Sequence, residues 1–265
     1  MKQFFVGLGL LLFSLSKLSS QELYVNSEPA SNMPTRLWSL RQTNMLMRMH
    51  ESVWLRNELQ VRYGINKNLM AEVAVLTSNA WHSPYSFDNV NVYTKYRFIT
   101  LDGTHTHFRM AAFGTLSIGN NKRHTFERNL TGDNTGWNVG LVATQLLHKL
   151  AISSSAVFLR PRQTEAIPTL WLGQYNLAAG YLLFPQTYSD YKQTNINLYA
   201  ELQMQQIKTS SLQYFTLDLA PAIQFIINSK IRCDLSYKYR ILDTDPNSHM
   251  WYTILARIEW NFIRE

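Results

Sequence analysis

The stretch 250–262 alternates along its whole length between two sets of residues. One set is entirely apolar or aromatic, while the set between them ends in Arg257, Glu259 and Asn261. A period of two over thirteen residues indicates a strand, because successive side chains point to opposite faces. Soluble strands run to about 5–6 residues, whereas a strand that crosses a bilayer at a tilt needs roughly 9–11. The stretch therefore predicts a membrane-spanning strand.

The same alternation returns along the chain. Clear ladders with an apolar face and a polar face occupy 53–63, 90–98, 171–183, 196–204, 215–227 and 231–241. Weaker ladders lie near 36–49, 68–77, 106–118, 137–147 and 149–160. The total is about twelve strands. Pro221 lies inside one ladder and predicts a bulge or interruption there, because proline cannot donate to a ladder.

The connections support a single closed sheet. With an even number of strands and both ends of the chain in the periplasm, short turns should alternate with longer outer loops. Short turns are expected at 64–68, 102–104, 148–149 and 228–230, and long loops at 78–88 and 119–136; three other connections depart from the rule. The sequence thus predicts an all-β fold, a closed antiparallel up-and-down transmembrane β-barrel of about twelve strands over residues 37–265.

A soluble β-sandwich or lipocalin-like barrel would also alternate, with the apolar face turned inward. The number of long strands in one exported domain favours the membrane barrel. Aromatic residues at the ends of the apolar faces favour it as well, since rings gather at bilayer interfaces. The tryptophans expected in these girdles are Trp54, Trp137, Trp171, Trp251 and Trp260.

The first residues predict export. Lys2 precedes an apolar run at 4–15, which is followed by serines and a lysine. This order is typical of a secretory signal peptide, and the run is too short to span a bilayer as a helix. We expect residues 1–20 to be the signal peptide, with cleavage after Ser20, and residues 21–36 to be a periplasmic lead-in to the barrel.

Composition narrows the class further. Mean hydropathy is −0.20 and no later apolar run approaches the length of a spanning helix, which excludes a helical membrane protein. The single cysteine, Cys233, excludes an internal disulfide framework. The net charge of +7 comes from basic residues dispersed along strands instead of clustered, so no nucleic-acid partner is predicted.

Near the end of the chain, Trp260 and Phe262 form an aromatic-x-aromatic pair. With the ladders, this pair resembles bacterial outer-membrane β-barrels of the small porin-like transporter type. The resemblance implies location in the outer membrane and, as partners, outer-membrane lipid and the barrel assembly machinery. Three residues follow the pair, and Arg257 stands where such terminal signals favour glycine.

The polar faces carry the candidate functional residues, because a lumen tolerates charge where lipid does not. A basic excess would favour anionic or polar solutes, whereas mutual pairing would make the same residues a structural network; both interpretations stay open. The basic lumen candidates are Arg56, Arg62, Lys95, Arg97, Arg232, Lys238, Arg240 and Arg257. The acidic candidates are Glu58, Glu201, Asp218, Asp234 and Glu259.

Three functions remain open: a pore for small solutes, a lipid-modifying barrel enzyme, and a plugged structural or docking barrel. His105 and His107 would share one face of a strand, but without a clear third ligand we predict no metal site and no cofactor. An enzyme would need a nucleophile and a base near the outer interface. Loop residues Ser83, His82, His124 and His249 offer the groups but no recognisable constellation, so no catalytic residue is predicted.

The barrel prediction has a direct biochemical test. Unheated protein in detergent should migrate differently from boiled protein in gel electrophoresis, because a closed sheet stays folded until heated. It should also fractionate with the outer membrane. Full solubility without detergent would contradict the membrane interpretation.

Overall fold

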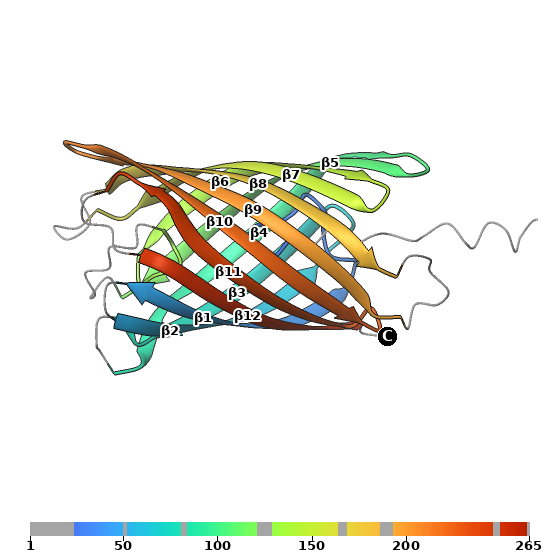
Figure 1. Cartoon of the computed structure of the whole chain (residues 1–265), viewed down its shortest axis with the longest axis horizontal. Coiled ribbons are helices and arrows are strands. Elements are labelled where there is room, and N and C mark those ends of the chain that lie inside the picture. The colour runs from blue at the N-terminus through green and yellow to red at the C-terminus, as the bar shows by residue number, and fades with distance from the viewer. Residues whose placement is uncertain are drawn as a thin grey trace, which may run out of the picture.

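The computed structural model describes residues 24–49, 52–80, 84–120, 129–163, 169–185, 193–245 and 250–263. Over these ranges the chain forms one closed antiparallel barrel, in which each strand pairs with its neighbours in sequence and the first pairs with the last (Figure 1). The predicted fold is confirmed. The strands are β1 (Leu37–Met49), β2 (Ser52–Gly64), β3 (Leu69–Ser78), β4 (Ser86–Asp102), β5 (Thr106–Gly119), β6 (Gly136–Leu147), β7 (Leu150–Pro161), β8 (Thr169–Phe184), β9 (Asn195–Thr209), β10 (Gln213–Ile227), β11 (Ile231–Asp243) and β12 (Met250–Ile263).

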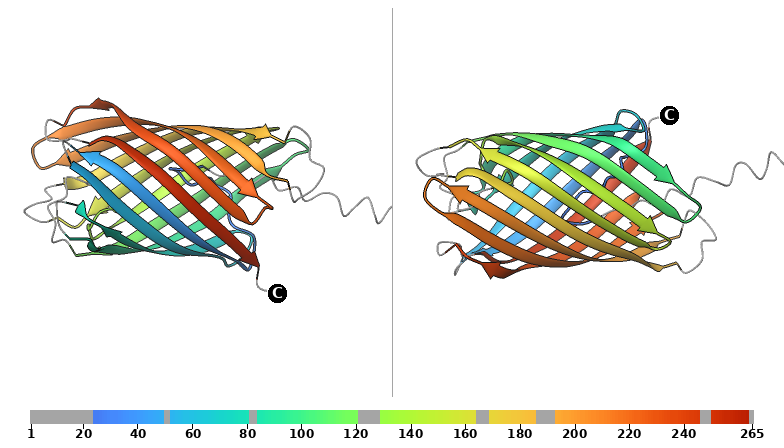
Figure 2. Two further views of the ribbon diagram at one scale, coloured as in Figure 1. Left: turned by 60° about the horizontal axis from the view of Figure 1, so that its bottom comes forward. Right: turned by 90° about the horizontal axis from the view of Figure 1, so that it is seen from above.

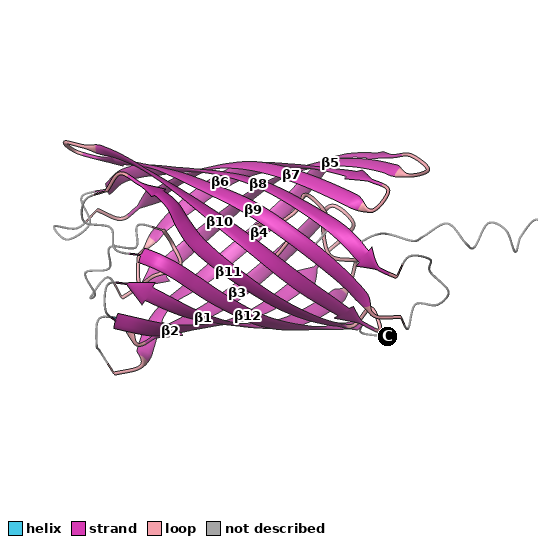
Figure 3. Cartoon of the chain, in the orientation of Figure 1, coloured by secondary structure: helices cyan, strands magenta, loops and turns pink. Residues whose placement is uncertain are grey.

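The strands are long and tilted against the barrel axis (Figure 2). They contain between 10 and 17 residues, enough for each to cross a hydrocarbon layer. The described chain consists of strands and loops (Figure 3). Among these residues no helix has the length and hydropathy needed to span a membrane.

Side-chain exposure shows which face of the sheet points outward. Large apolar residues are exposed, with 71% of Ile118 and 58% of Trp260 accessible, while charged residues on the opposite face are buried. On β12, Ile258 is exposed and the neighbouring Glu259 is buried. A soluble protein shows the reverse arrangement. The apolar ladders are therefore the lipid-facing surface of the barrel.

Both ends of the barrel sequence lie at one rim, since Leu37 pairs with Ile263. This rim corresponds to the periplasmic side of outer-membrane barrels. The four expected short turns fall on it, between β2 and β3, β4 and β5, β6 and β7, and β10 and β11, while the connection between β8 and β9 on the same rim is longer. The connections between β1 and β2 and between β9 and β10 are also short, but they lie at the outer rim. The longest connection, between β5 and β6, lies at the opposite, outer rim.

One local expectation is corrected. Trp54 was expected in an interfacial girdle, but it points into the barrel, 5% exposed, against Met47 and Ala80. It shares its strand face with the inward-facing Arg56, and strand parity decides the direction of a side chain whatever its distance from the strand end. Trp137 and Trp260 do face outward. The side chain of Trp251 lies outside the described residues.

A second expectation, the interruption at Pro221, is confirmed. It pairs with Ala200 of β9, while the ladder toward β11 omits the pairs that Ala220 and Pro221 would make. The interruption expected from the missing N–H is therefore present. The shift of register lies earlier, between Leu217 and Asp218.

The segment before β1 has an unexpected position. Residues 24–36, which belong to the expected periplasmic lead-in 21–36, are called the plug segment below. The segment begins inside the barrel and reaches the rim at its exposed residues 34–36 (Figure 2). Tyr24 and Val25 are almost fully buried there. They pack among inward-facing Leu146, Ala151, Ala178, Tyr199, Ala222 and Leu255.

Gly180 makes room for this packing. It pairs with Tyr199 of β9, and a Cβ on Gly180 would lie 2.3 Å from a ring atom of Tyr199. That ring cannot easily move, because it contacts Tyr24 edge-on and its hydroxyl donates to Gln224 at 3.0 Å. Gly173, seven residues earlier on the lipid-facing side of β8, has ordinary space for a Cβ, the nearest atom being 3.5 Å away.

We expect Gly180→Ala to lower the free energy of unfolding by about 1–3 kcal/mol, because the added methyl group overpacks a fixed ring. Gly173→Ala should change it by less than about 0.5 kcal/mol. Urea unfolding of both variants in lipid vesicles measures the difference. Equal stability of the two variants would show that the plug segment does not hold Tyr199 in place.

Candidate functional site

Glu201 anchors the beginning of the plug segment. Its side chain is on the inner face of β9 and the residue is 0% exposed. Its Oε1 accepts the backbone N–H groups of Val25 at 2.9 Å and Asn26 at 2.8 Å, and its Oε2 accepts the Ser27 hydroxyl at 2.8 Å. The side chain of Asn26 also donates to Ser236 of β11 at 2.9 Å. A buried carboxylate thus supplies acceptors to backbone donors that no strand satisfies.

Glu28 is the charged centre of the plug segment. Its carboxylate lies 3.0 Å from Arg41 of β1, 3.0 Å from Arg62 of β2 and 3.6 Å from Lys95 of β4. Burial disfavours the ionised carboxylate, but Arg62, Arg41 and Lys95 outweigh it and hold the pKa of Glu28 well below its ordinary value. Glu28 is therefore an anion at neutral pH and ties three strands to the segment.

Lys95 and Thr144 bind the middle of the segment. The Nζ of Lys95, a residue only 1% exposed, donates to the carbonyl oxygens of Pro29 and Ser31 at 2.8 Å each. The N–H of Ala30 donates to Thr144 of β6 at 2.9 Å. Together with Glu201 of β9, which lies across the ring of strands from β2 to β4, these contacts hold the segment across the lumen.

Glu259 of β12 pairs with several other buried charges in the periplasmic half of the barrel. Its carboxylate lies 2.6 Å from Arg41, 3.0 Å from Arg232 and 3.6 Å from Arg62. Arg232 also lies 3.1 Å from Asp234 on the same strand face. These side chains come from β1, β2, β11 and β12, so the network crosses the seam where the barrel closes.

Most other predicted lumen residues pair within the barrel. Arg240 bonds both Asp218 and Asp243. Arg257 lies 3.6 Å from Asp234, and Arg56 of β2 lies 3.6 Å from Asp88 of β4, both buried. Pairing of this kind matches the structural interpretation of the charged faces.

Two predicted residues differ from the rest. Arg97 lies near the periplasmic rim, where its Nη2 donates to the carbonyl oxygen of Lys67 at 2.6 Å, and it does not join the network around Glu259. Glu58 accepts from Gln60 at 3.1 Å. Sequence reasoning missed Arg41, Glu72 and Asp88 on the strands and Glu28 in the plug segment. Arg41 and Glu72 lie in stretches with weak alternation, and Asp88 and Glu28 were expected outside the strands.

The outer side of the lumen is covered by residues 129–135, here called the outer cap. Asn89 of β4 donates to the carbonyl oxygens of Leu130, at 2.8 Å, and of Gly132. Ser117 of β5 donates to the carbonyl oxygen of Asn134 at 2.8 Å. Leu130 points inward and packs against four inner-face residues, Leu159, Leu172, Ile207 and Tyr214.

A chamber of about 330 Å³ lies between the plug segment and the outer cap. Val25 to Glu28 line it from one side and Asn129 to Thr131 from the other. Its wall is rich in amides and hydroxyls: Gln60, Asn91, Tyr93, Thr115, Asn138, Gln174, Asn176, Gln203 and Gln205.

Several of these wall groups have unused hydrogen-bonding capacity. Within the described part of the chain, the side-chain oxygens of Gln60, Asn91, Tyr93 and Asn138 find no hydrogen-bond partner although they are buried. Buried polar atoms are normally satisfied. The chamber wall therefore presents polar atoms that a solute or water would satisfy.

His105 and His107 have different partners in the structure. His107 lies 2.8 Å from Asp102 through its Nδ1, while the ring of His105 contacts that of His148 with centroids 5.0 Å apart. Among the described residues no group of three or more His, Cys, Asp or Glu side chains is placed to hold a metal ion. Ser83, His82, His124 and His249 lie outside the described residues.

No protein-family model and no curated protein matches the chain. Solved structures do match. The COG4313 outer membrane channel from Pseudomonas putida F1 has a TM-score of 0.59 at 12% identity, covering 90% of this chain and 100% of that one. NanC porin has 0.53 at 13% identity, covering 85% and 100%, and KdgM porin 0.51 at 7%, covering 84% and 99%. These likenesses show the fold alone, and it is that of the porin-like β-barrels of the bacterial outer membrane.

Proposed function

We propose that the chain is a gated channel for small polar solutes, with the chamber as a station on the path. The observation that carries the proposal is the polar chamber between the plug segment and the outer cap. A barrel that served only as a scaffold would gain nothing from buried side-chain oxygens without hydrogen-bond partners, since each costs about 1–3 kcal/mol. Movement of the plug segment and the outer cap opens the path.

The charges of the chamber favour uncharged or zwitterionic solutes. Three carboxylates and three cations line it, so neither sign of solute meets a net field: Glu28, Glu58, Glu72, Arg41, Lys238 and Arg257. The basic excess counted from the sequence is offset by Glu28, Glu72 and Asp88, which pair with inward-facing cations.

The solved structures that resemble the chain also support a transport function. One is a COG4313 outer membrane channel, and KdgM porin is also known in complex with disordered oligogalacturonate, at a TM-score of 0.53 with this chain. A wall of amides and hydroxyls suits polyhydroxylated solutes, because each hydroxyl both donates and accepts. A lipid-modifying enzyme has no comparable support among the described residues.

Conductance in planar bilayers tests the channel. The wild-type protein should show rare discrete openings, and Glu28→Gln should raise the open fraction about tenfold. The physical reason is that removing one partner of a partly exposed ion-pair cluster costs about 1.4 kcal/mol of docking energy. Glu58→Gln, which alters a chamber carboxylate outside the plug segment, is the control and should leave the open fraction unchanged.

The same recordings test the charge balance. In a salt gradient the reversal potential should lie close to zero, because the chamber carries equal numbers of both charges. Absence of openings in both wild type and Glu28→Gln would support a sealed structural barrel, and strong anion selectivity would contradict the balanced chamber.

The pH dependence follows from Glu28. Its pKa is lowered on docking, so the docking energy it contributes is present above the pKa of the free carboxyl, about 4.3, and is lost as the pH falls through the lower, docked value. The part of the wild-type open fraction that depends on Glu28 should therefore be the same at pH 7.5 and pH 5 and should rise only in stronger acid. Glu28→Gln should lack this acid rise, and an acid rise of equal size in that variant would contradict the assignment to Glu28.

A further inference from the structure

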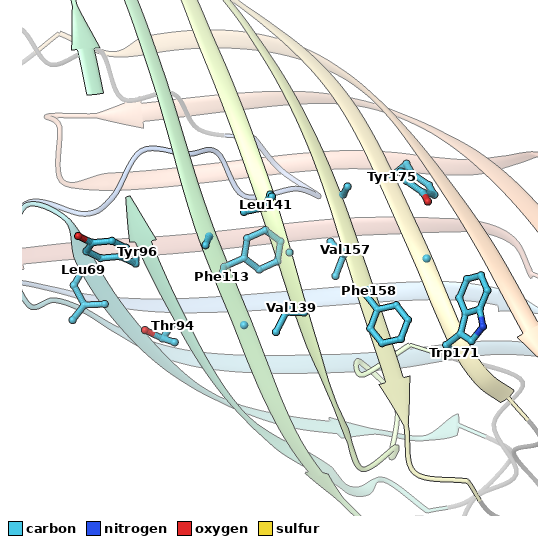
Figure 4. A pocket seen from close by; sticks show the side chains of 15 residues that line it. Leu69, Thr94, Tyr96, Phe113, Val139, Leu141, Val157, Phe158, Trp171 and Tyr175 are labelled. Atoms are coloured by element: carbon cyan, nitrogen blue, oxygen red, sulfur yellow. The ribbon is translucent and has the colours of Figure 1, made fainter. Parts of the chain in front are cut away.

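A furrow crosses the lipid-facing surface of the barrel from β4 to β8 (Figure 4). Its volume is about 910 Å³. Four outward-facing residues with small side chains lie along the furrow: Ala112, Gly114, Ala156 and Gly173. Larger side chains border it: Leu69, Tyr96, Val139, Leu141, Phe158, Trp171 and Tyr175. Four strand spacings of about 4.8 Å give it a width of roughly 19 Å, enough for several acyl chains side by side.

Aromatic rings lie at the outer end of the furrow. Trp137 of β6 lies over Phe158 of β7 with centroids 5.8 Å apart, and Phe158 lies 6.2 Å from Trp171 of β8. Such belts form where a barrel passes from hydrocarbon to headgroups. Because β7 runs from the periplasmic rim to the outer rim, this belt belongs to the outer leaflet.

A second cavity, of about 530 Å³, begins where the furrow ends. It is lined by Arg160 and Arg162, by Trp137, and by the exposed apolar residues Leu116 and Ile118. Arg160 is the next outward-facing residue of β7 after Phe158, about 7 Å further along the strand. Both arginines are exposed, so two cations stand directly above an apolar furrow at headgroup level.

We propose that the furrow and this cavity together bind one phosphorylated glycolipid of the outer leaflet. Its acyl chains lie across the outward-facing side chains of β5 to β8, and its phosphates contact Arg160 and Arg162. Guanidinium groups suit this role, because they bind phosphate oxygens through two parallel hydrogen bonds.

The geometry favours a glycolipid over a glycerophospholipid on three grounds. The arginine cavity lies at the outer end of the barrel, the furrow is wider than a pair of acyl chains requires, and the cavity offers two arginines where a single phosphate needs one. The indole of Trp137 adds an apolar surface with a polar edge, which sugars contact well. The site is separate from the lumen and does not depend on the channel function.

The test titrates purified full-length protein in neutral detergent with diphosphorylated lipid A, counting bound lipid by native mass spectrometry and measuring Kd by calorimetry. One lipid should bind per barrel. Arg160→Ala combined with Arg162→Ala should weaken binding at least about tenfold, since charge-assisted hydrogen bonds are lost. Dephosphorylated lipid A should bind the wild type as weakly as lipid A binds this variant.

Gly173→Phe tests the furrow independently, because it fills the floor with a side chain that faces lipid, and it should also weaken binding. Lys230→Ala, at a periplasmic turn, is the matched charge control and should bind as the wild type does. Heat-modifiable migration verifies that each variant is folded. Equal affinity of the wild type and the double-arginine variant, or phosphatidylglycerol binding as tightly as lipid A, would overturn the proposal.

Discussion

The barrel depends on closure at the seam between β1 and β12, and the ion-pair network around Glu259 stabilises that seam. Once these strands pair, every strand has two hydrogen-bonded neighbours and no unpaired edge meets lipid. Closure also decides what each side chain faces: alternate residues of a strand point into the lumen, and the residues between them point toward lipid. Charges on the inner face must then neutralise one another, because an isolated buried ion costs several kcal/mol. Glu259 meets that requirement at the seam by binding Arg41, Arg62 and Arg232 from three other strands.

A barrel of this circumference is too wide for its own side chains to fill everywhere. The chain fills it from both ends, with the plug segment on one side and the outer cap on the other. Both fillers combine polar and apolar contacts. The plug segment adds ion pairs of Glu28 to the apolar packing of Tyr24 and Val25, whereas the outer cap is held by hydrogen bonds to its carbonyl groups and by the apolar cluster around Leu130. The polar chamber is the volume that these two fillers leave between them, which explains why its wall combines residues from many strands.

The strands could be predicted from the sequence, because period-two alternation is a local property and the bilayer makes it long. The fillers could not, since residues 24–36 and 129–135 carry no periodicity and their positions depend on contacts with distant strands. The prediction for Trp54 was wrong because it relied on the distance of the residue from the strand end. The alternation of side chains along the strand places Trp54 on the same face as Arg56, and this alternation decides its direction. One signal for the plug segment was available, namely small residues on inner faces that are otherwise polar or large, such as Ala178, Gly180 and Ala222.

The plug segment continues into β1 without slack, because the N–H of Arg36 donates to Gly64 at the rim and β1 begins at the next residue. In the proposed channel, the segment acts as a tethered ligand. Short tethers give effective concentrations of about a millimolar or more. A solute that shares the segment's binding groups must exceed that level to displace it, so such a channel opens at high solute concentration and stays shut at trace levels.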